Sequence, residues 1–364
     1  MNLLDSKTAT SQHTPSLSTR RSICFVSETR HATRPILDPS VRYRCYHPAE
    51  KLAAEGHWCT VKSASQFFEM PSLGHDVYVF HRPNMARDNF AQILQALRRQ
   101  GATLIADYDD LIFGTAEIAL ISSAVKNGTL SEERAIEAFA GNLAGLRQFD
   151  KVTTSTAPLA ERVREFNPGA QVEVVPNFLP ESIVGPHAEL RTPFIRRPPT
   201  SIGYFSGTRS HDKDFPIVGA VLHRVLSENP DFNLLIVGPV QVPRGLASLP
   251  NVTTAPATSF LRLPSLMSMC ATVIAPLETT AFNACKSRVK FLEAAIGGCR
   301  LIATPIPDMA AVGDAHITLV STTDAWYEAL SAPLDAEARS ALVQRNLAFL
   351  GANDGIDGLR SFVS

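Results

Sequence analysis

The sequence lacks the features of a membrane-spanning or exported chain. No apolar run approaches the ~18–20 residues that a spanning helix needs. Residues 1–20 are polar and rich in Ser and Thr, without the apolar centre of a secretory signal. We therefore expect a disordered tail over 1–20 and a cytoplasmic protein, with the inner face of the membrane as an alternative location.

The sequence also lacks a cysteine framework and an excess of charge of one sign. No C-x-x-C pair and no H-E-x-x-H motif is present, so we expect reduced thiols and no metal site. The formal net charge of −1 provides no overall field for nucleic acid, and we expect no such partner. The cysteines are Cys24, Cys45, Cys59, Cys270, Cys285 and Cys299.

What the 364 residues do contain is an alternation of short apolar runs and helical stretches. Hydrophobic residues make up 45% and charged residues 19%, which is typical of a globular protein with enough chain for two domains. This order predicts two parallel, doubly wound α/β sheets. We expect strands over 22–28, 58–64, 76–82, 102–106, 151–155, 172–175, 201–205, 233–237, 251–254, 272–275 and 301–303, and helices over 46–55, 90–100, 129–148, 215–227, 261–269 and 287–296.

A proline-rich stretch separates the two series. Five prolines fall between 180 and 200, which indicates a linker. We predict an N-terminal domain over 21–180, a linker over 181–200, a C-terminal domain over 201–345 and a helical segment over 346–364. The basic residues Arg191, Arg196 and Arg197 fit either solvated linker charge or peripheral contact with a membrane.

The first candidate site is the loop after strand 201–205. Gly207 lets a ligand approach the backbone closely, and the following helix presents free N–H groups. Thr208, Arg209 and His211 add side-chain donors. The combination suits an anionic group such as a diphosphate, although an ordinary polar turn has the same composition.

The second candidate site is the start of helix 287–296. Ser287 can cap this helix, and Lys286, Arg288 and Lys290 make its first turn cationic. Cations there oppose the helix dipole, so a bound polyanion would explain them. Lys286 and Lys290 are four residues apart, which predicts one helix face and one shared diphosphate. Glu293 lies within reach of a ribose hydroxyl, and a solvated helix face is the alternative.

The third candidate site is an acidic strand end. Asp107, Asp109 and Asp110 follow strand 102–106, and His81 and Arg82 end the preceding strand. Such carboxylates can hold a divalent metal beside a diphosphate, or lie near a sugar hydroxyl. Capping of the strand end and hydrogen bonds within the loop are the structural alternative.

Four segments carry a resemblance to a known family. IGYFSGTRSHDKDF, FNACKSRVKFLEAAIGGCRLIATPI, VVPNFL and VRYRCYHPAEKLAAEGH resemble retaining glycosyltransferases of the GT-B fold, family 4, that build bacterial surface polysaccharides. The likeness covers about residues 22–350. Cys285 stands at the first glutamate of the family's E-x7-E motif. The run from Asn283 to Glu293 matches the N-x-x-K-S-x-x-K-x-x-E form of some of its polysaccharide enzymes.

The resemblance implies two Rossmann-like domains facing across a cleft, with a helical C-terminal segment. It implies transfer of a sugar from a nucleotide-sugar donor to a glycan or lipid-linked acceptor, with retention and with neither metal nor cofactor. The implied donor residues are Gly207, Thr208, Arg209, His211, Asn283, Lys286, Ser287, Lys290 and Glu293, and the candidate catalytic residues are His81, Asp107, Asp110 and Glu293.

Three other functions remain open on the sequence. A metal-dependent transferase would use Asp107 and Asp109 as its D-x-D motif. A sugar-nucleotide epimerase would share the two-domain fold but not the reaction. A non-catalytic GT-B-like subunit of a glycan assembly complex would explain the altered E-x7-E motif.

Overall fold

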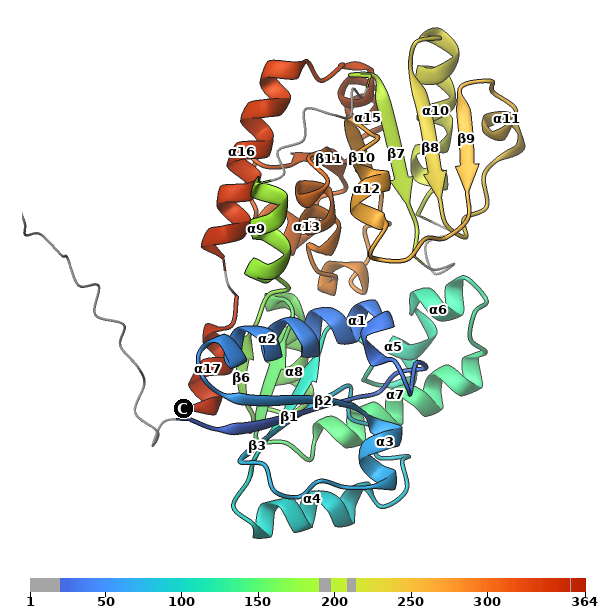
Figure 1. Cartoon of the computed structure of the whole chain (residues 1–364). Coiled ribbons are helices and arrows are strands. Elements are labelled where there is room, and N and C mark those ends of the chain that lie inside the picture. The colour runs from blue at the N-terminus through green and yellow to red at the C-terminus, as the bar shows by residue number, and fades with distance from the viewer. Residues whose placement is uncertain (1–19, 190–197, 208–213, 354) are drawn as a thin grey trace, which may run out of the picture.

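Two separate six-stranded sheets form the frame of the computed structural model, which describes residues 20–189, 198–207, 214–353 and 355–364. Every strand pairing in both sheets is parallel, and helices cover both faces (Figure 1). Parallel sheets need such covering because both of their faces are apolar. The two sheets confirm the predicted α/β architecture.

The N-terminal domain is built on the first sheet, in the order β2-β1-β3-β4-β5-β6. Its central strand β3 is buried at all five positions, as its unbroken apolar run requires. The strands are β1 (Ser22–Ser27), β2 (Trp58–Ser63), β3 (Val77–His81), β4 (Thr103–Tyr108), β5 (Lys151–Thr154) and β6 (Gln171–Val174). The helices are α1 (Pro39–Val41), a π-helical turn (Arg42–Tyr46), α2 (His47–Ala54), α3 (Ala64–Glu69), α4 (Phe90–Arg99), α5 (Ala116–Leu120), α6 (Ser123–Lys126), α7 (Glu132–Leu146) and α8 (Ala157–Phe166).

The C-terminal domain is built on the second sheet, in the order β12-β11-β10-β7-β8-β9. Its strands are β7 (Ser201–Phe205), β8 (Asn233–Val237), β9 (Val252–Ala255), β10 (Thr272–Ala275), β11 (Arg300–Ala303) and β12 (Thr318–Leu319). Its helices are α10 (Pro216–Glu228), α11 (Arg244–Ala247), α12 (Leu263–Met267), α13 (Val289–Ile296), α14 (Pro307–Ala310) and α15 (Thr323–Ser331). No helix in the described ranges is both long and apolar enough to cross a bilayer.

The end of the chain returns to the N-terminal domain. Helix α16 (Ala336–Ala352) packs on α13, and α17 (Asp357–Val363) then lies against β4, β5 and β6 (Figure 1). Phe362 is 2% exposed and shares a core with Phe25. Arg360 pairs with Glu55 at 2.5 Å. The predicted helical segment 346–364 is therefore the end of α16 followed by a helix that completes the first core.

The predicted linker 181–200 begins with a helix. Residues Glu181–Glu189 form α9, with Pro186 inside it, and α9 packs on α16. The basic cluster Arg191, Arg196 and Arg197 lies outside the described residues, so the expectation of membrane contact stays a prediction.

Candidate functional site

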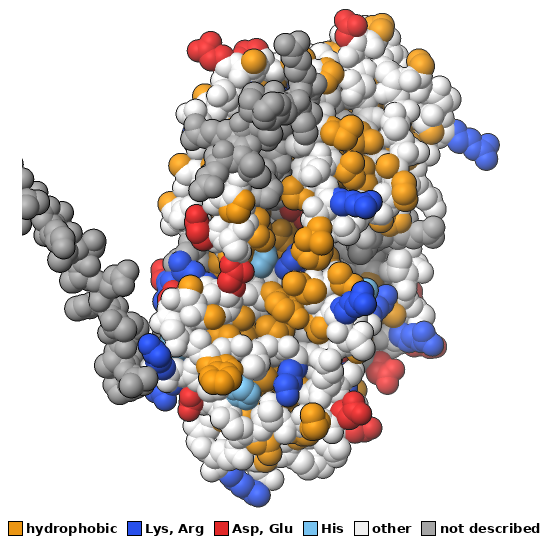
Figure 2. Space-filling view, viewed as in Figure 1, with side chains coloured by type: hydrophobic (Ala, Val, Ile, Leu, Met, Phe, Trp, Pro, Cys, Tyr) orange, Lys and Arg blue, Asp and Glu red, His pale blue; other side chains and the backbone are white. Residues whose placement is uncertain are grey.

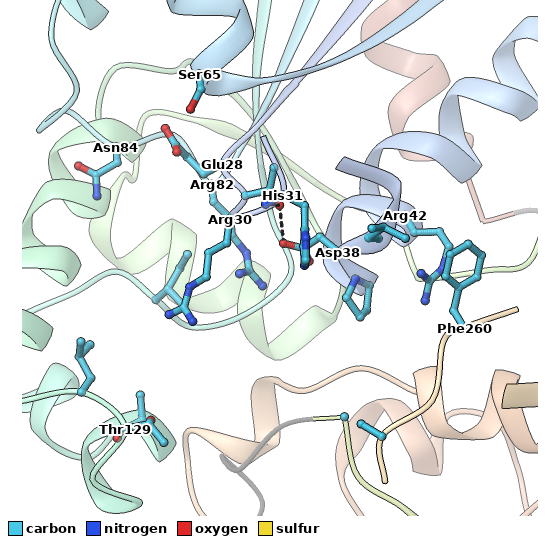
Figure 3. A pocket seen from close by; sticks show the side chains of 18 of the residues that line it. Glu28, Arg30, His31, Asp38, Arg42, Ser65, Arg82, Asn84, Thr129 and Phe260 are labelled. Carbon is cyan, nitrogen blue, oxygen red and sulfur yellow. Dashed lines mark hydrogen bonds between the residues drawn. The ribbon is translucent and has the colours of Figure 1, made fainter. Parts of the chain in front are cut away.

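A cavity of about 1610 Å³ lies between the two domains. Its walls are mainly the loops that follow the carboxyl ends of the strands, which is where ligands bind in parallel α/β sheets. Residues 28–31 follow β1 and residues 82–89 follow β3 on the N-terminal wall. Residues 205–207 end β7 and 257–260 follow β9 on the C-terminal wall. Figure 3 shows side chains from both walls reaching toward this space.

Three of the predicted donor residues line this cavity. Gly207 is exposed and Lys290 and Glu293 are half-buried, all on the C-terminal wall. Lys290 Nζ donates to Glu293 Oε2 at 2.9 Å, one helical turn away on α13. A cation and a carboxylate side by side can meet a phosphate and a sugar hydroxyl of one ligand. The other residues predicted in the Gly207 loop, Thr208, Arg209 and His211, lie outside the described residues.

Gly238, in the loop after β8, lies against the backbone of the Gly207 loop. Gly238 has a φ of +106°, a left-handed conformation that favours glycine. A Cβ atom there would lie 1.9 Å from the carbonyl oxygen of Ser206. Only glycine therefore lets the end of β8 approach the backbone that carries Gly207 into the cavity.

The expected cap of α13 is wrong. The helix begins at Val289, and its N-cap is Arg288 without a side-chain hydrogen bond. Ser287 lies one residue too early and instead accepts a hydrogen bond from Asn177 Nδ2 of the N-terminal domain at 2.9 Å. Ser287 therefore links the two domains.

The expected shared helix face of Lys286 and Lys290 is also wrong. Lys286 precedes the helix in extended backbone, with φ −72° and ψ 152°. Its Nζ lies 3.6 Å from Asp110 Oδ1 across the domain boundary, and Lys286 does not line the cavity. The two ammonium groups thus point to different partners, Asp110 and Glu293.

The cationic start of α13 has a structural explanation. The guanidinium of Arg288 pairs with Asp308 at 2.6 Å, and the backbone N–H of Arg288 donates to the same carboxylate at 2.7 Å. Asp308 is 6% exposed and supplies the anion that the helix dipole favours at this end. A bound polyanion is not needed to explain Arg288.

The two residues at the altered E-x7-E motif, Asn283 and Cys285, are buried outside the cavity. Cys285 is 2% exposed, burial raises the pKa of its thiol to about 11, and its carbonyl accepts from Thr156 Oγ1 at 3.0 Å. Asn283 is 3% exposed and donates to the carbonyl of Glu278 at 2.9 Å, while its Oδ1 atom has no hydrogen-bond partner in the part of the chain that the structure describes. Neither side chain lines the cavity.

The acidic strand end is a buried, neutralised network. Asp107 is 2% exposed and accepts from Arg44 at 2.5 and 3.1 Å, from His81 Nδ1 at 2.9 Å and from Thr153 at 2.7 Å. Burial alone would raise the pKa of Asp107, but the charge of Arg44 lowers it to about 2. Asp107 is an anion held in place by three groups, and it does not reach the cavity.

The network continues from His81 to the cavity wall. His81 is 1% exposed, and its Nε2 lies 2.8 Å from Ser40 Oγ, which in turn donates to Asp109. Arg82 Nε donates to Asp109 at 2.7 Å, and Arg82 lies 3.5 Å from Asp110. Arg82 adopts a φ of 57°, and of these residues it alone lines the cavity. His81 and Asp107 therefore reach the cavity only through other side chains.

Sequence reasoning missed the two arginines of the π-helical turn. Arg44 neutralises Asp107 from 63 positions away, and Arg42 lines the cavity itself. The available signal was two arginines at alternate positions within the otherwise apolar stretch that precedes α2.

No group of three His, Cys, Asp or Glu side chains within the described ranges is arranged to hold a metal ion. Asp107 and Asp109, the D-x-D pair, are already bound by Arg44, His81 and Arg82.

Comparison with known proteins gives a fold but no sequence family. No family model and no curated protein matches the sequence. The fold is similar to that of α,α-trehalose 6-phosphate synthase from Burkholderia multivorans, at 12% identity and a TM-score of 0.61 over 94% of this chain and 98% of that one.

Two further solved structures have a similar fold. A glycosyltransferase from Rickettsia africae is 14% identical, with a TM-score of 0.55 over 94% of this chain and 96% of that one. WaaG, a glycosyltransferase involved in lipopolysaccharide biosynthesis, is 13% identical, with a TM-score of 0.55 over 94% of this chain and 98% of that one. These similarities confirm the predicted fold class: the chain has a GT-B-like fold of two Rossmann-like α/β domains facing across a cleft.

Proposed function

We propose that this chain is a glycosyltransferase that moves a sugar from a nucleotide-sugar donor to a glycan or lipid-linked acceptor. Its place would be cell-surface polysaccharide biosynthesis, in the cytoplasm or at the inner face of the membrane. The observation that carries the proposal is the Lys290–Glu293 pair, which lines the C-terminal wall of the interdomain cavity together with Gly207. The solved structures of similar fold include glycosyltransferases, which supports the same reaction class here.

The chemistry of transfer explains what the C-terminal wall would do. As the bond from the sugar to the diphosphate breaks, negative charge grows on the leaving diphosphate. The Lys290 ammonium can stabilise that charge, and a fixed cation acts without reorganisation. Glu293 would accept a hydrogen bond from a ribose or sugar hydroxyl. Thr208, Arg209, His211 and Asn283 stay proposed donor residues. Lys286 and Ser287 were predicted as donor residues, and their contacts with Asp110 and Asn177 lead us to propose instead that they link this site to the N-terminal domain.

The N-terminal network would position rather than react. Asp107 and His81 are buried behind Ser40 and Asp109, and the end of that chain is Arg82 at the cavity wall. We therefore assign His81 and Asp107 the role of holding Arg82 in place. Asp110, between Arg82 and Lys286, joins the acceptor side to the donor side.

Transfer without a metal ion fits the charges of this site. The D-x-D carboxylates already have cationic partners, and Lys290 offers a cation at the cavity. The metal-dependent alternative would require Asp107 or Asp109 to leave a buried ion pair, which is costly.

The test is incubation of the purified chain with UDP-, GDP-, ADP- and dTDP-sugars, with products separated by anion-exchange chromatography. A transferase releases nucleoside diphosphate slowly to water, with and without EDTA. Interconversion of the sugar would identify an epimerase instead. The absence of both reactions with all of these sugars would support a non-catalytic subunit. Activity that is lost in EDTA and restored by Mn²⁺ would support the D-x-D alternative.

A further inference from the structure

Arg42 is a buried cation on the cavity wall without a carboxylate partner among the residues that the structure describes. Its side chain extends from the π-helical turn, and the residue is 7% exposed. Within the described ranges it takes part in no ion pair, and its guanidinium donates one hydrogen bond, from Nη1 to the carbonyl oxygen of Ile36 at 3.3 Å. Buried charges in proteins are normally paired, because leaving water is costly. The remaining N–H groups of the Arg42 guanidinium are therefore available to hydrogen-bond a ligand.

Its neighbour Arg44 provides an internal comparison. The two arginines are two residues apart on the same turn and are both buried. Arg44 is fully bound by Asp107, Asn177 and the carbonyl of Val175. Burial would lower the pKa of Arg44, but Asp107 raises it above its ordinary value. Burial also lowers the pKa of Arg42, and the neighbouring charges offset this only in part. Asp107 thus neutralises Arg44, whereas the charge of Arg42 is available to a ligand in the cavity.

The nearest acidic groups are already engaged. Asp38 and Glu293 act on Arg42 only at longer range. Asp38 accepts from Thr29 Oγ1 at 2.8 Å and from the Ser40 N–H at 3.0 Å, and Glu293 accepts from Lys290. Neither carboxylate therefore takes the place of a bound anion.

A contact across the cleft orients the Arg42 guanidinium. Its central carbon lies 3.9 Å from the ring centre of Phe260, which belongs to the C-terminal wall (Figure 3). A ring against the face of a guanidinium attracts the cation and leaves its N–H edge free. That edge is the part that binds phosphate or carboxylate through two parallel hydrogen bonds. Because the ring comes from the opposite domain, this orientation depends on how the two domains are placed against each other.

We propose that Arg42 binds a phosphate-class anion of the substrate, with the Phe260 ring holding its guanidinium in the binding orientation. This inference rests on the proposed function, which offers two sources of the same chemistry. The anion is either the diphosphate of the donor or a phosphate carried by the acceptor. In both cases the N-terminal domain contributes a charge to binding, opposite Lys290.

The experiment compares calorimetric affinities for separate probes, UDP and GDP on the donor side and glucose 6-phosphate on the acceptor side. Arg42→Gln should weaken binding of one kind of probe by about 10- to 100-fold, the range of a charge-assisted pair. Arg42→Lys, which keeps the charge but loses the planar fork, should give a smaller loss. Phe260→Leu should weaken binding of the same probe, although this substitution removes no charge.

Arg224→Gln is the matched control. Arg224 lies 4.0 Å from the ring centre of Tyr327 in a similar stack, on α10, and does not line the cavity. Melting curves show whether each variant is folded. If Arg42→Gln does not fold, the affinities of Arg42→Lys and Phe260→Leu still test the proposal. A loss for the nucleotides assigns Arg42 to the donor, and a loss for the sugar phosphate assigns it to the acceptor. Wild-type affinity for every probe in all three variants would overturn this inference alone, whereas a wild-type chain that binds no probe would contradict the proposed function as well.

Discussion

Around the cavity, charged side chains differ in whether the fold has already given them a partner. Arg44, Arg82 and Arg288 are bound by aspartates of the same chain and Lys290 by Glu293, whereas Arg42 takes part in no ion pair among the described residues. Spacing in the sequence identified Lys290 and Glu293 because both belong to one helix. It misplaced Lys286 because the start of α13 depends on a tertiary contact 20 positions away.

Lys290→Ala should weaken binding of the nucleoside diphosphate by about 1.5–3 kcal/mol, as expected for a charge-assisted hydrogen bond. The melting temperature should change little because Lys290 is half-buried and its Glu293 partner is on the same helix. Calorimetric titration measures the affinity. Lys151→Ala, at the amino end of β5 and outside the cavity lining, is the control. Equal affinities for wild type and Lys290→Ala would remove Lys290 from the donor site.

His47 should make stability depend on pH. Burial lowers its pKa from 6.5 to about 4, so the folded protein keeps this histidine neutral while the unfolded chain takes up a proton. As pH falls from 6.5 to 4, the free energy of unfolding should decrease by about 3 kcal/mol from this group. Urea unfolding across this range should show a shallower decrease in His47→Gln. The exposed His223→Gln should behave as wild type, and identical profiles for wild type and His47→Gln would contradict the assignment.

At the scale of elements, strands were predicted better than helices. Buried parallel strands appear in the sequence as short apolar runs, so β7, β8 and β10 begin and end where expected. Helix α8 was missed although Thr156 caps it and Pro158 occupies its first turn. Helix α9 was missed because its proline suggested a linker. The docking of α17 on the first sheet joins segments more than 300 positions apart, as in the Arg360–Glu55 pair, and local pattern carries no such information.

The last helix should be essential to the N-terminal core. Phe362→Ala removes a ring that is 2% exposed and packs in the same core as Phe25, and such truncations cost about 3–5 kcal/mol. Denaturant unfolding should show this loss. Ser361→Ala, on the exposed face of α17, should change stability by less than about 0.5 kcal/mol. A small effect of Phe362→Ala would mean that α17 is not a stable part of this core.

At the scale of the whole molecule, the two domains meet through polar contacts as well as apolar surface. Asn177 bonds Ser287, Thr156 bonds the Cys285 carbonyl, and Asp110 pairs with Lys286. Figure 2 shows hydrophobic side chains gathered over the boundary between the domains on one face. These contacts hold the segment before α13 against the N-terminal domain, so the two walls of the cavity are positioned together.

Asp110→Asn should lower turnover while leaving nucleotide affinity nearly unchanged. Asp110 links Arg82 to Lys286 but does not line the cavity. The pair is partly exposed, so its loss should change stability by less than about 1 kcal/mol. Steady-state kinetics and titration of the nucleoside diphosphate separate the two effects. Asp150→Asn, an exposed change beside the start of β5, is the control, and an equal loss of nucleotide binding in Asp110→Asn would place Asp110 in the donor site.

The central claim is that the cavity between the domains binds a nucleotide sugar. Thermal unfolding of the wild-type chain with UDP-, GDP-, ADP- and dTDP-sugars tests this most directly, since a ligand of the native state stabilises it by about 2.7 kcal/mol at 100 times its Kd. We expect a higher melting temperature with at least one of these sugars, and a smaller increase for Lys290→Ala at the same concentration. Unchanged melting temperatures for the wild-type chain with all four nucleotide sugars would contradict the central claim.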